Sequence, residues 1–345
     1  MKNNTATKLR LITKAITIML GSFASALAMW SMMQTQAQAE TTAKPAVPMA
    51  KFQAPGFYRM MLGSFEVTVL SDGTASRHVD EIMSKPEDVR AAYAHHHEEL
   101  PAELSINTYL INTGSKLLLV DTGAGELFGA ASDGSGSSNR LIRNLRAAGY
   151  QPEQVDAVLL THIHGEHSGG LSAGGKRLFT NAEVYVDNND ANYWLSIAQA
   201  NAAPAAKQLT FTQSRATVNP YADAGRLKTF SGAQELFAGV STISSYGHTP
   251  GHTAYLISSQ GKSLLLWGDV IHAGAAQFKD PTITIAYDFD AAAAVNSRQH
   301  LLQLAASKGY LVGSAHISFP GLGHISSSPA GYEWLTAPYQ IQGTY

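Results

Sequence analysis

The segment His162-Ile163-His164-Gly165-Glu166-His167 decides how this sequence folds and what it holds. It directly follows Val155 to Leu160, a continuous apolar run typical of a strand buried on both faces. Imidazoles two residues apart in an extended segment point the same way, and the turn that follows brings Glu166 and His167 toward the same cavity. If the segment were only a solvated polar loop or held isolated core histidines, the presence of four ligand-type side chains within six residues would be a coincidence. The segment therefore predicts a metal site.

Three later segments each add one side chain of the kind that binds metal. His248 lies in the turn Gly247 to His252, Asp269 follows an apolar strand, and His316 follows another. Because the chain has no cysteine, its metal ligands are imidazole and carboxylate groups, a set that suits zinc and also manganese, cobalt or iron. We expect divalent metal ions, with zinc as the first choice.

Length and composition exclude several classes of protein. A chain of 345 residues that is 45% hydrophobic and 14% charged buries a large core, which excludes intrinsic disorder. The 24 lysines and arginines nearly balance 26 aspartates and glutamates, so no basic surface points to a nucleic-acid partner. The absence of cysteine excludes disulfides, thiolate nucleophiles and iron–sulfur clusters. The expected partner is a small-molecule substrate, and a homodimer is possible.

The first 39 residues have the pattern of a secretory signal peptide. Basic residues precede an uncharged, mostly apolar run from Ala15 to Met33, and Ala37-Gln38-Ala39 offers a cleavage site before Glu40. A retained membrane anchor is the alternative, since the run is just long enough to span a bilayer. Cleavage predicts a periplasmic or secreted protein without stable membrane insertion, in which residues 40–56 form a flexible leader.

The rest of the sequence, 57–345, predicts one layered α/β domain. Phe65 to Leu70 alternates like a strand and ends at a predicted turn, Ser71-Asp72-Gly73; Thr108 to Ile111 and Lys116 to Val120 predict a hairpin. The remaining apolar patterns predict strands at Val184 to Val186, Leu264 to Trp267 and Tyr310 to Gly313, and helices at Asn139 to Ala148, Ala191 to Ala200 and Ala291 to Ala306. We expect mixed sheets packed face to face with helices outside.

These motifs resemble the metallo-β-lactamase superfamily, whose pattern H-x-H-x-D-H, then a His, an Asp and a final His, is matched in order. The sequence is most similar to the methyl parathion hydrolase group of organophosphorus hydrolases and lactonases. That similarity lies in four stretches: Tyr58 to Gly63, Gly149 to Asp156, Gly247 to Thr253 and Ser318 to Ile325. The resemblance implies a four-layer αββα fold, in which two mixed sheets pack face to face with helices on both outer faces.

The resemblance also implies a binuclear site. One ion would be held by His162, His164 and His248, the other by Glu166, His167 and His316, and Asp269 would bridge them together with a hydroxide. The sequence departs from the family at Glu166, where the pattern has aspartate. The additional methylene displaces the carboxylate, so we expect the second ion to be bound more weakly or differently.

Several other polar residues have less specific roles. Asp121 is expected to orient a ligand histidine. His252 and His324 either do the same or fix turns by hydrogen bonds. His95, His96 and His97 point in three directions on a helix expected over Ala91 to Leu100, so they are not expected to share an ion. The sequence around His78 and His300 predicts no function for either residue.

The function predicted is that of an exported binuclear metal-dependent hydrolase. Its metal-bridging hydroxide would hydrolyse organophosphate triesters of the methyl parathion and paraoxon type, and lactones or aryl esters. Asp269 and His272 are the predicted catalytic residues. His272 would assist a lactone's leaving alkoxide, although simple lining of the pocket is an equal alternative. Lactonase-like members of the family resemble this sequence at that position more than dedicated organophosphate hydrolases do.

Neutral substrates favour an apolar pocket. Trp194 is a candidate by resemblance, and four more candidates flank the metal segments: Phe211, Phe278, Ile285 and Tyr287. Each of these side chains has core packing as its alternative.

Other functions remain open at this point. A dedicated acyl-homoserine-lactone or other lactonase is the first alternative, and a β-lactamase is the second. A glyoxalase II type thioesterase would need a basic patch near the motifs, and a flavodiiron protein would need a flavin domain; neither is found in the sequence. A periplasmic metal-binding protein without turnover is the alternative outside the enzymes.

Overall fold

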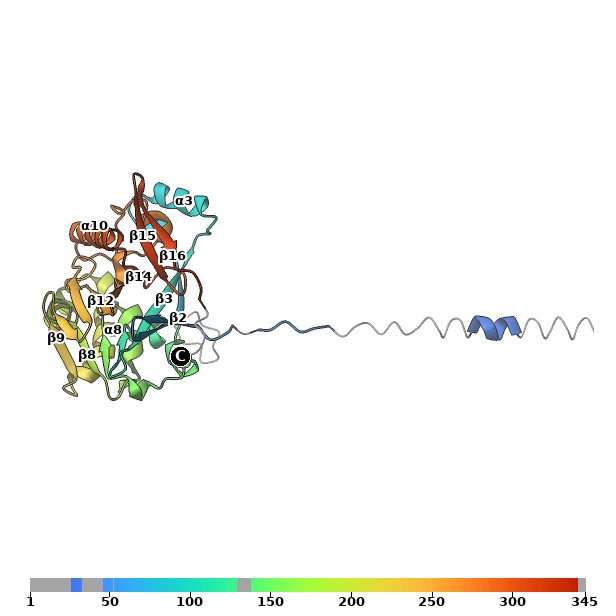
Figure 1. Cartoon of the computed structure of the whole chain (residues 1–345), viewed down its shortest axis with the longest axis horizontal. Coiled ribbons are helices and arrows are strands. Elements are labelled where there is room, and N and C mark those ends of the chain that lie inside the picture. The colour runs from blue at the N-terminus through green and yellow to red at the C-terminus, as the bar shows by residue number, and fades with distance from the viewer. Residues whose placement is uncertain (1–25, 33–45, 52, 129–137, 341–345) are drawn as a thin grey trace, which may run out of the picture. The chain divides into compact units, whose positions relative to one another are not determined.

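The computed structural model describes residues 26–32, 46–51, 53–128 and 138–340 (Figure 1). The chain divides into two units, Met1–Phe52 and Gln53–Tyr345. In the first unit, residues 26–32 form a helix whose side chains are exposed. The predicted cleavage site and most of the predicted signal peptide lie outside the described residues. Among the described residues, no helix is both long and apolar enough to cross a membrane.

The second unit contains a first sheet of seven strands in the order β1-β2-β3-β4-β5-β8-β9. The strands from β1 to β4 are antiparallel, and those from β4 to β9 are parallel, so the sheet is mixed. Its strands are β1 (Phe57–Leu62), β2 (Phe65–Arg77), β3 (Ala102–Asn112), β4 (Leu117–Val120), β5 (Ala157–Leu159), β8 (Glu183–Asp187) and β9 (Leu227–Phe230). The predicted hairpin is present, as β3 and β4.

A second sheet of seven strands has the order β10-β11-β12-β13-β14-β15-β16. Its strands are β10 (Glu235–Phe237), β11 (Val240–Ser244), β12 (Thr253–Ser259), β13 (Lys262–Leu266), β14 (Leu311–Gly313), β15 (Leu322–Ser328) and β16 (Gly331–Thr336). Only the pair β13 and β14 is parallel, and helix α10 (Ala291–Lys308) connects these two strands. Two short strands, β6 (Ser172–Ala173) and β7 (Lys176–Arg177), pair apart from both sheets.

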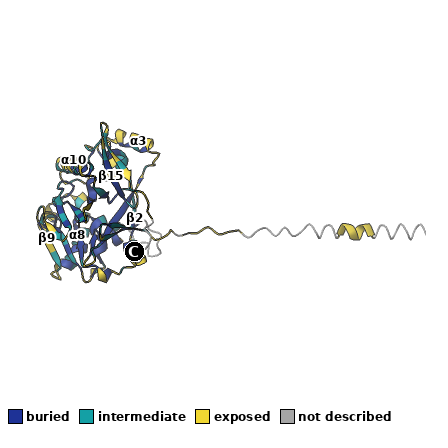
Figure 2. Ribbon diagram, viewed as in Figure 1, coloured by how far each residue is buried: buried dark blue, intermediate teal, exposed yellow. Residues whose placement is uncertain are grey.

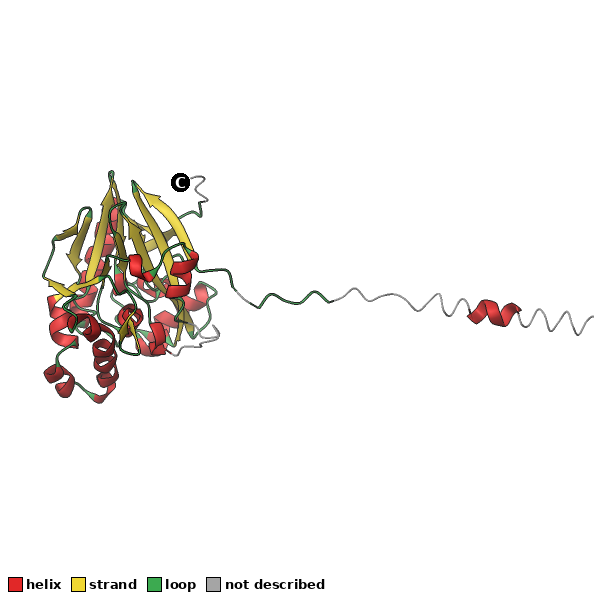
Figure 3. Ribbon diagram, turned by 90° about the horizontal axis from the view of Figure 1, so that it is seen from below, coloured by secondary structure: helices red, strands yellow, loops and turns green. Residues whose placement is uncertain are grey.

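Alternating side chains divide the core into layers, because successive residues of a strand face opposite sides of the sheet. Val67, Val69 and Leu118 of the first sheet pack against Tyr255 and Ile257 of the second. On its outer face the first sheet is covered by α4 (Leu141–Ala147), α6 (Asn188–Trp194) and α8 (Ala205–Ala222), and the second sheet by α10. The central strands of both sheets are accordingly buried, whereas edge strands such as β9 and β16 are more exposed (Figures 2 and 3). The predicted four-layer αββα fold is confirmed.

A smaller apolar cluster lies beside the sheets. It joins α2 (Val79–Ile82), α3 (Pro86–His95) and α9 (Gly274–Gln277) through Met83, Tyr93 and Ala276. The other short helices are α5 (Gly165–Ser168), α7 (Ile197–Ala202), η1 (Gly125–Phe128), η2 (Pro152–Gln154), η3 (Gly169–Leu171) and η4 (Gly268–Val270).

Three local predictions were wrong. Ser71-Asp72-Gly73 is not a turn but a bulge within β2, because the buried Asp72 carboxylate accepts backbone hydrogen bonds at the start of α4. The helix expected over 191–200 is two helices, α6 and α7, because Ser196 caps α7 by accepting from the N–H of Gln199. The helix expected over Ala91 to Leu100 ends at His95, since His97 has a φ of 57°.

Candidate metal centre

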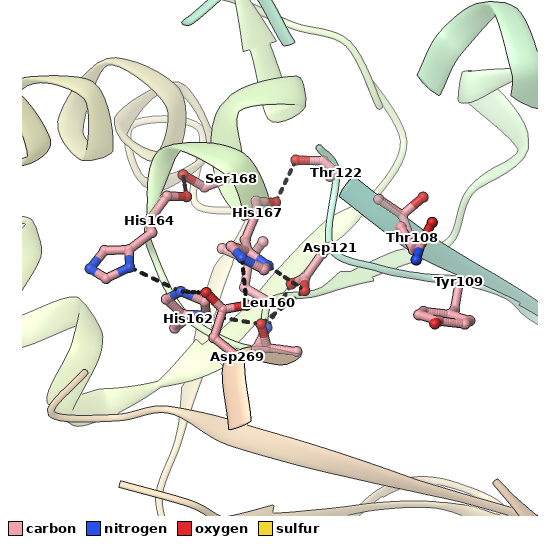
Figure 4. A network of polar contacts seen from close by, with 12 residues as sticks. Thr108, Tyr109, Asp121, Thr122, Leu160, His162, His164, His167, Ser168 and Asp269 are labelled. Carbon is pink, nitrogen blue, oxygen red and sulfur yellow. Dashed lines mark hydrogen bonds and ion pairs between the residues drawn. The ribbon is translucent and has the colours of Figure 1, made fainter. Parts of the chain in front are cut away.

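The loop after β5 is shaped by the buried side chain of Asp121. One oxygen of this carboxylate accepts from the backbone N–H of Thr161 at 2.8 Å, and the other accepts from the Thr161 hydroxyl at 2.8 Å. The same second oxygen lies 2.8 Å from Nδ1 of His167 (Figure 4). The predicted supporting role of Asp121 agrees with this geometry. The backbone N–H groups of His167 and Ser168, in α5, donate to the carbonyl oxygen of His164. This turn places the ring of His167 beside that of His162.

The seven predicted ligands come together in two groups that share Asp269. The first group is His162, His164, His248 and Asp269, and the second is Glu166, His167, Asp269 and His316. Oδ2 of Asp269 lies 3.6 Å from Nε2 of His162 and 3.3 Å from Nε2 of His248. Oδ1 lies 3.0 Å from Nε2 of His167 and 3.1 Å from Nε2 of His316. Each carboxylate oxygen therefore faces a different group of imidazoles.

The donor atoms fit divalent cations. Neighbouring ligand atoms around a tetrahedral zinc lie about 3.3 Å apart, since each bond is about 2.0 Å long. Both Asp269 oxygens and Nε2 of His167 are buried without a hydrogen-bond partner. Buried polar atoms normally find partners, so orphaned donor atoms converging at this spacing indicate a place for metal ions. His162, His164 and His248 would hold one ion and Glu166, His167 and His316 the other.

The electrostatics hold two of the candidate imidazole ligands and the shared carboxylate in the forms that bind metal. Burial, reinforced by neighbouring histidines, lowers the pKa of His162 and His164 well below 6.5, so both rings are neutral with a free lone pair. Burial raises the pKa of Asp269, but the surrounding imidazoles outweigh it and hold that pKa well below its ordinary value. The carboxylate shared by the two groups therefore carries a negative charge.

Four of the five candidate ligand histidines are oriented through their second nitrogen, among them His248 and His316. Nδ1 of His248 lies 3.0 Å from a carboxylate oxygen of Asp288, and Nδ1 of His316 donates to the Ser105 carbonyl oxygen at 2.8 Å. Such contacts fix the ring and the nitrogen that faces the metal. Burial opposes the charged form of His248, but Asp269 and Asp288 together raise its pKa to about 9. The sequence analysis missed Asp288, since it belongs to no motif.

The two histidines with uncertain roles have different positions. Nε2 of His252 accepts a hydrogen bond of 3.0 Å from the backbone N–H of Asp269, so this ring positions the shared carboxylate. His324 is exposed on β15 and bonds to the carbonyl of Tyr310, which is a purely structural contact. His78 and His300 are also exposed.

Two further buried residues hold the loop that carries His272. Oε1 of Gln277 accepts from the backbone N–H of His272 at 2.8 Å, and its amide group donates to the Ile283 carbonyl. The guanidinium of Arg298, buried on α10, donates to the carbonyls of Val270 and Ile283. Neither Gln277 nor Arg298 could be identified from the sequence, because their side chains bind backbone groups, which leave no motif.

His272 itself points at the shared carboxylate of Asp269. Its Nε2 lies 3.2 Å from Oδ2 of Asp269, and its ring stacks on His316 with centroids 5.4 Å apart. The other ring nitrogen, Nδ1, is buried without a hydrogen-bond partner. Burial lowers the pKa of His272 to about 4. At neutral pH the ring is therefore uncharged and acts through a neutral N–H or a lone pair.

A cavity of about 750 Å³ opens beside this centre, with His272 and His316 among its lining residues. Of the predicted pocket residues, Phe278 lines it. Trp194 contacts His164 edge to face at 5.1 Å, with Phe211 packed behind it in the core. The structure places Ile285 in the small core of α2, α3 and α9, and Tyr287 at the surface.

The family follows from comparison with known proteins. Residues 101–316 match the model of the metallo-β-lactamase superfamily, which covers more than half of the chain. The chain belongs to the metallo-β-lactamase superfamily. The predicted superfamily is thus confirmed.

The individual relatives of this metallo-β-lactamase superfamily member have low sequence identity to it. An N-acyl homoserine lactonase from Bacillus cereus is 26% identical over 176 residues, which are 47% of this chain and 62% of that protein. The chain thus matches less than two thirds of this relative. The crystal structure of hydrolase AbOPH, in the beta lactamase superfamily, is 33% identical with a TM-score of 0.78, covering 84% of this chain and 100% of that one.

A second solved structure shares the fold of this superfamily member. AidC, described as a dizinc quorum-quenching lactonase, has a TM-score of 0.74 at 24% identity, and covers 83% of this chain and 99% of its own. At this identity the similarity supports the fold alone. The His and Asp cluster of the present chain agrees with the expected divalent metal.

Proposed function

We propose that this superfamily member is a binuclear lactone hydrolase that also accepts aryl esters and organophosphate triesters. The observation that carries the proposal is the arrangement of two ligand groups around one shared carboxylate, Asp269, with His272 beside it. Curated relatives named as N-acyl homoserine lactonases, and a structural neighbour described as a dizinc lactonase, support lactones as the first substrate class.

The residues of the chain divide the chemical work. Two divalent ions held there would supply an activated water molecule and a Lewis acid for the oxygen that gains charge. Asp269 faces both ligand groups and holds them at a fixed separation, while His252 fixes its backbone. Asp121 and Asp288 orient His167 and His248, so the donor atoms are arranged before the substrate arrives.

His272 favours lactones over phosphotriesters as the main substrates. Its neutral ring lines the cavity with Nε2 toward Asp269 and Nδ1 without a partner, so Nδ1 is available for the carbonyl oxygen or the leaving oxygen of a lactone. An alkoxide leaving group is a strong base and gains from such a donor, whereas a nitrophenoxide needs little assistance. Phosphotriester hydrolysis is therefore the secondary activity in this proposal.

We further propose that zinc is the metal and that the protein is exported. Zinc agrees with donor groups that contain nitrogen and oxygen but no sulfur. Export rests on the basic and apolar pattern of residues 1–39. Cell fractionation, with N-terminal sequencing of the mature protein, tests this part: a start near Glu40 supports it, and an intact Met1 in the cytoplasm contradicts it.

One assay tests the proposed function. Zinc-loaded and metal-free protein is measured on dihydrocoumarin, an acyl-homoserine lactone, paraoxon, methyl parathion and nitrocefin. We expect zinc-dependent turnover, fastest on the lactones. Turnover of nitrocefin alone would identify a β-lactamase. Metal binding without turnover of any substrate would identify a metal-binding protein.

A further inference from the structure

The cavity beside the metal centre is a cleft between elements that are distant in sequence. Its walls come from α3, α9 and the hairpin β15–β16, and its inner end is formed by His272 and His316. A volume of about 750 Å³ exceeds that of a small lactone ring, so the cleft accommodates a substrate with an extended arm.

The described walls are mostly apolar. Phe278 and Trp334 stack at 5.7 Å between centroids, and Ile317 and Tyr332 also line the cleft. An apolar arm lying there gains free energy by leaving water, whereas a charged group would lose its hydration without a partner. The walls therefore favour uncharged substrates.

The charged residues that line the cleft are predominantly acidic. Among the residues that the structure describes, they are Glu98, Glu103 and Glu333 against a single ammonium group, that of Lys279. All four residues are exposed. Burial raises the pKa of Tyr93 above its ordinary value, and the negative charge of Glu98 adds to this rise. The charge of Glu98 therefore acts on a side chain of the cleft wall. The buried and unpartnered Nδ1 of His272 marks the inner end as a place where a ligand binds.

We propose that this cleft selects electrically neutral substrates that carry an apolar arm, and rejects anionic substrates of the same size. The inference rests on the proposed hydrolase function and specifies its substrate class. It also accounts for product release. Addition of water to a lactone or ester gives a carboxylic acid, which loses its proton at neutral pH, so the product is repelled by the same three carboxylates.

A matched pair of substrates tests the proposal with the zinc-loaded protein. 4-Nitrophenyl hexanoate and the mono-4-nitrophenyl ester of adipic acid have the same reacting bond and chain length, but the second ends in a carboxylate. We expect kcat/KM to be at least about tenfold higher for the hexanoate at low salt. The difference should shrink in 0.5 M NaCl, because salt screens charges at a distance.

Variants separate the acidic residues from the apolar walls. In the triple variant Glu98→Gln, Glu103→Gln and Glu333→Gln, the ratio of the two kcat/KM values should fall about fivefold, and Lys279→Gln should raise it. The double variant Glu153→Gln and Asp223→Asn, at exposed positions that do not line the cleft, is the control and should leave the ratio unchanged. A ratio near one, or a ratio insensitive to both salt and the triple variant, overturns the proposal.

Binding measurements separate this proposal from the proposed function. The corresponding 4-nitroanilides have a more resistant amide bond, and their binding quenches tryptophan fluorescence, including that of Trp334 in the wall. Tighter binding of the neutral anilide without hydrolysis of any ester or lactone would support the cleft's selectivity and contradict the hydrolase function. Equal affinity for both anilides, or binding of neither, would overturn the selectivity.

Discussion

The buried carboxylate of Asp190, on α6, accepts a hydrogen bond of 2.9 Å from the backbone N–H of Ile163, which lies between His162 and His164. Its other oxygen accepts one of 2.6 Å from Gly251, three residues beyond His248. One side chain thus fixes both loops that carry the imidazoles of the first ligand group.

Replacing Asp190 by alanine should weaken metal binding although Asp190 itself binds no ion. We expect about a 10- to 100-fold loss of zinc affinity, as is typical when residues that support ligands are removed. Competition with a chromophoric chelator measures it, and Asn192→Ala, at an exposed position of the same helix, is the control. Unchanged affinity in a folded Asp190→Ala variant would show that the two loops are held by other contacts.

Asp190 also predicts a pH dependence of stability. Burial raises its pKa from 3.8 to about 6, so the folded protein binds this proton more tightly than the unfolded chain. The resulting stability is complete below pH 4 and is lost as pH rises through about 6. Relative to Asp190→Asn, which does not titrate, the metal-free wild type should lose about 2 kcal/mol of unfolding free energy between pH 4 and 7. Urea denaturation of both proteins measures this difference, and a difference independent of pH would contradict it.

We expect the mature protein to bind two transition-metal ions per chain. The ions bind the folded state, so their removal by a chelator should lower the melting temperature by about 10 °C, given about 2.7 kcal/mol per site at 100-fold excess over Kd. Metal analysis after purification with zinc and without chelator gives the stoichiometry. A ratio near one would implicate Glu166, and Glu166→Asp should then fill the second site. A ratio well below one would refute the binuclear centre.

Replacing Asp269 by asparagine keeps the shape of the side chain and removes the charge that faces both ligand groups. We expect hydrolysis to fall by about 10²-fold or more, with a matching loss of bound metal. Activity and metal content are measured on the same samples. Retention of most activity would show that Asp269 is not a ligand.

Replacing His272 by leucine should separate the two substrate classes. Lactone hydrolysis loses a hydrogen-bond donor at the leaving or carbonyl oxygen, whereas the nitrophenoxide of paraoxon leaves without help. The two kcat/KM values should therefore diverge by at least about tenfold. Because the pKa of His272 lies at about 4, the effect should be constant between pH 6 and 8. Equal losses on both substrates would mean that His272 only supports the metal centre.

The convergence of the seven candidate ligands could be predicted from the sequence, because each of them follows a recognisable strand or sits in a Gly-rich turn. His162, His164 and His167 lie within six residues, and their convergence depends mainly on local geometry. The hairpin of β3 and β4 was likewise predictable, since alternation and a short polar connection are local signals.

Contacts between distant segments could not be predicted in this way. Asp288 meets His248 across 40 residues, and Arg298 meets Val270 from a helix whose pattern shows no sign of it. The turn expected at Ser71 to Gly73 failed for the same reason: Asp72 satisfies the N–H groups of Arg140 and Leu141, 68 and 69 residues away, and the strand continues through a bulge.

The sequence by itself determined the chemistry of the metal centre, because residue type and spacing on short segments decide which donor atoms point together. The tertiary structure alone decided which groups orient those donors, where Asp269 stands between them, and which side chains surround the cleft. The physical reason is that these relations depend on the packing of two sheets and their helices. Such packing is a property of the whole core, and no local pattern records it.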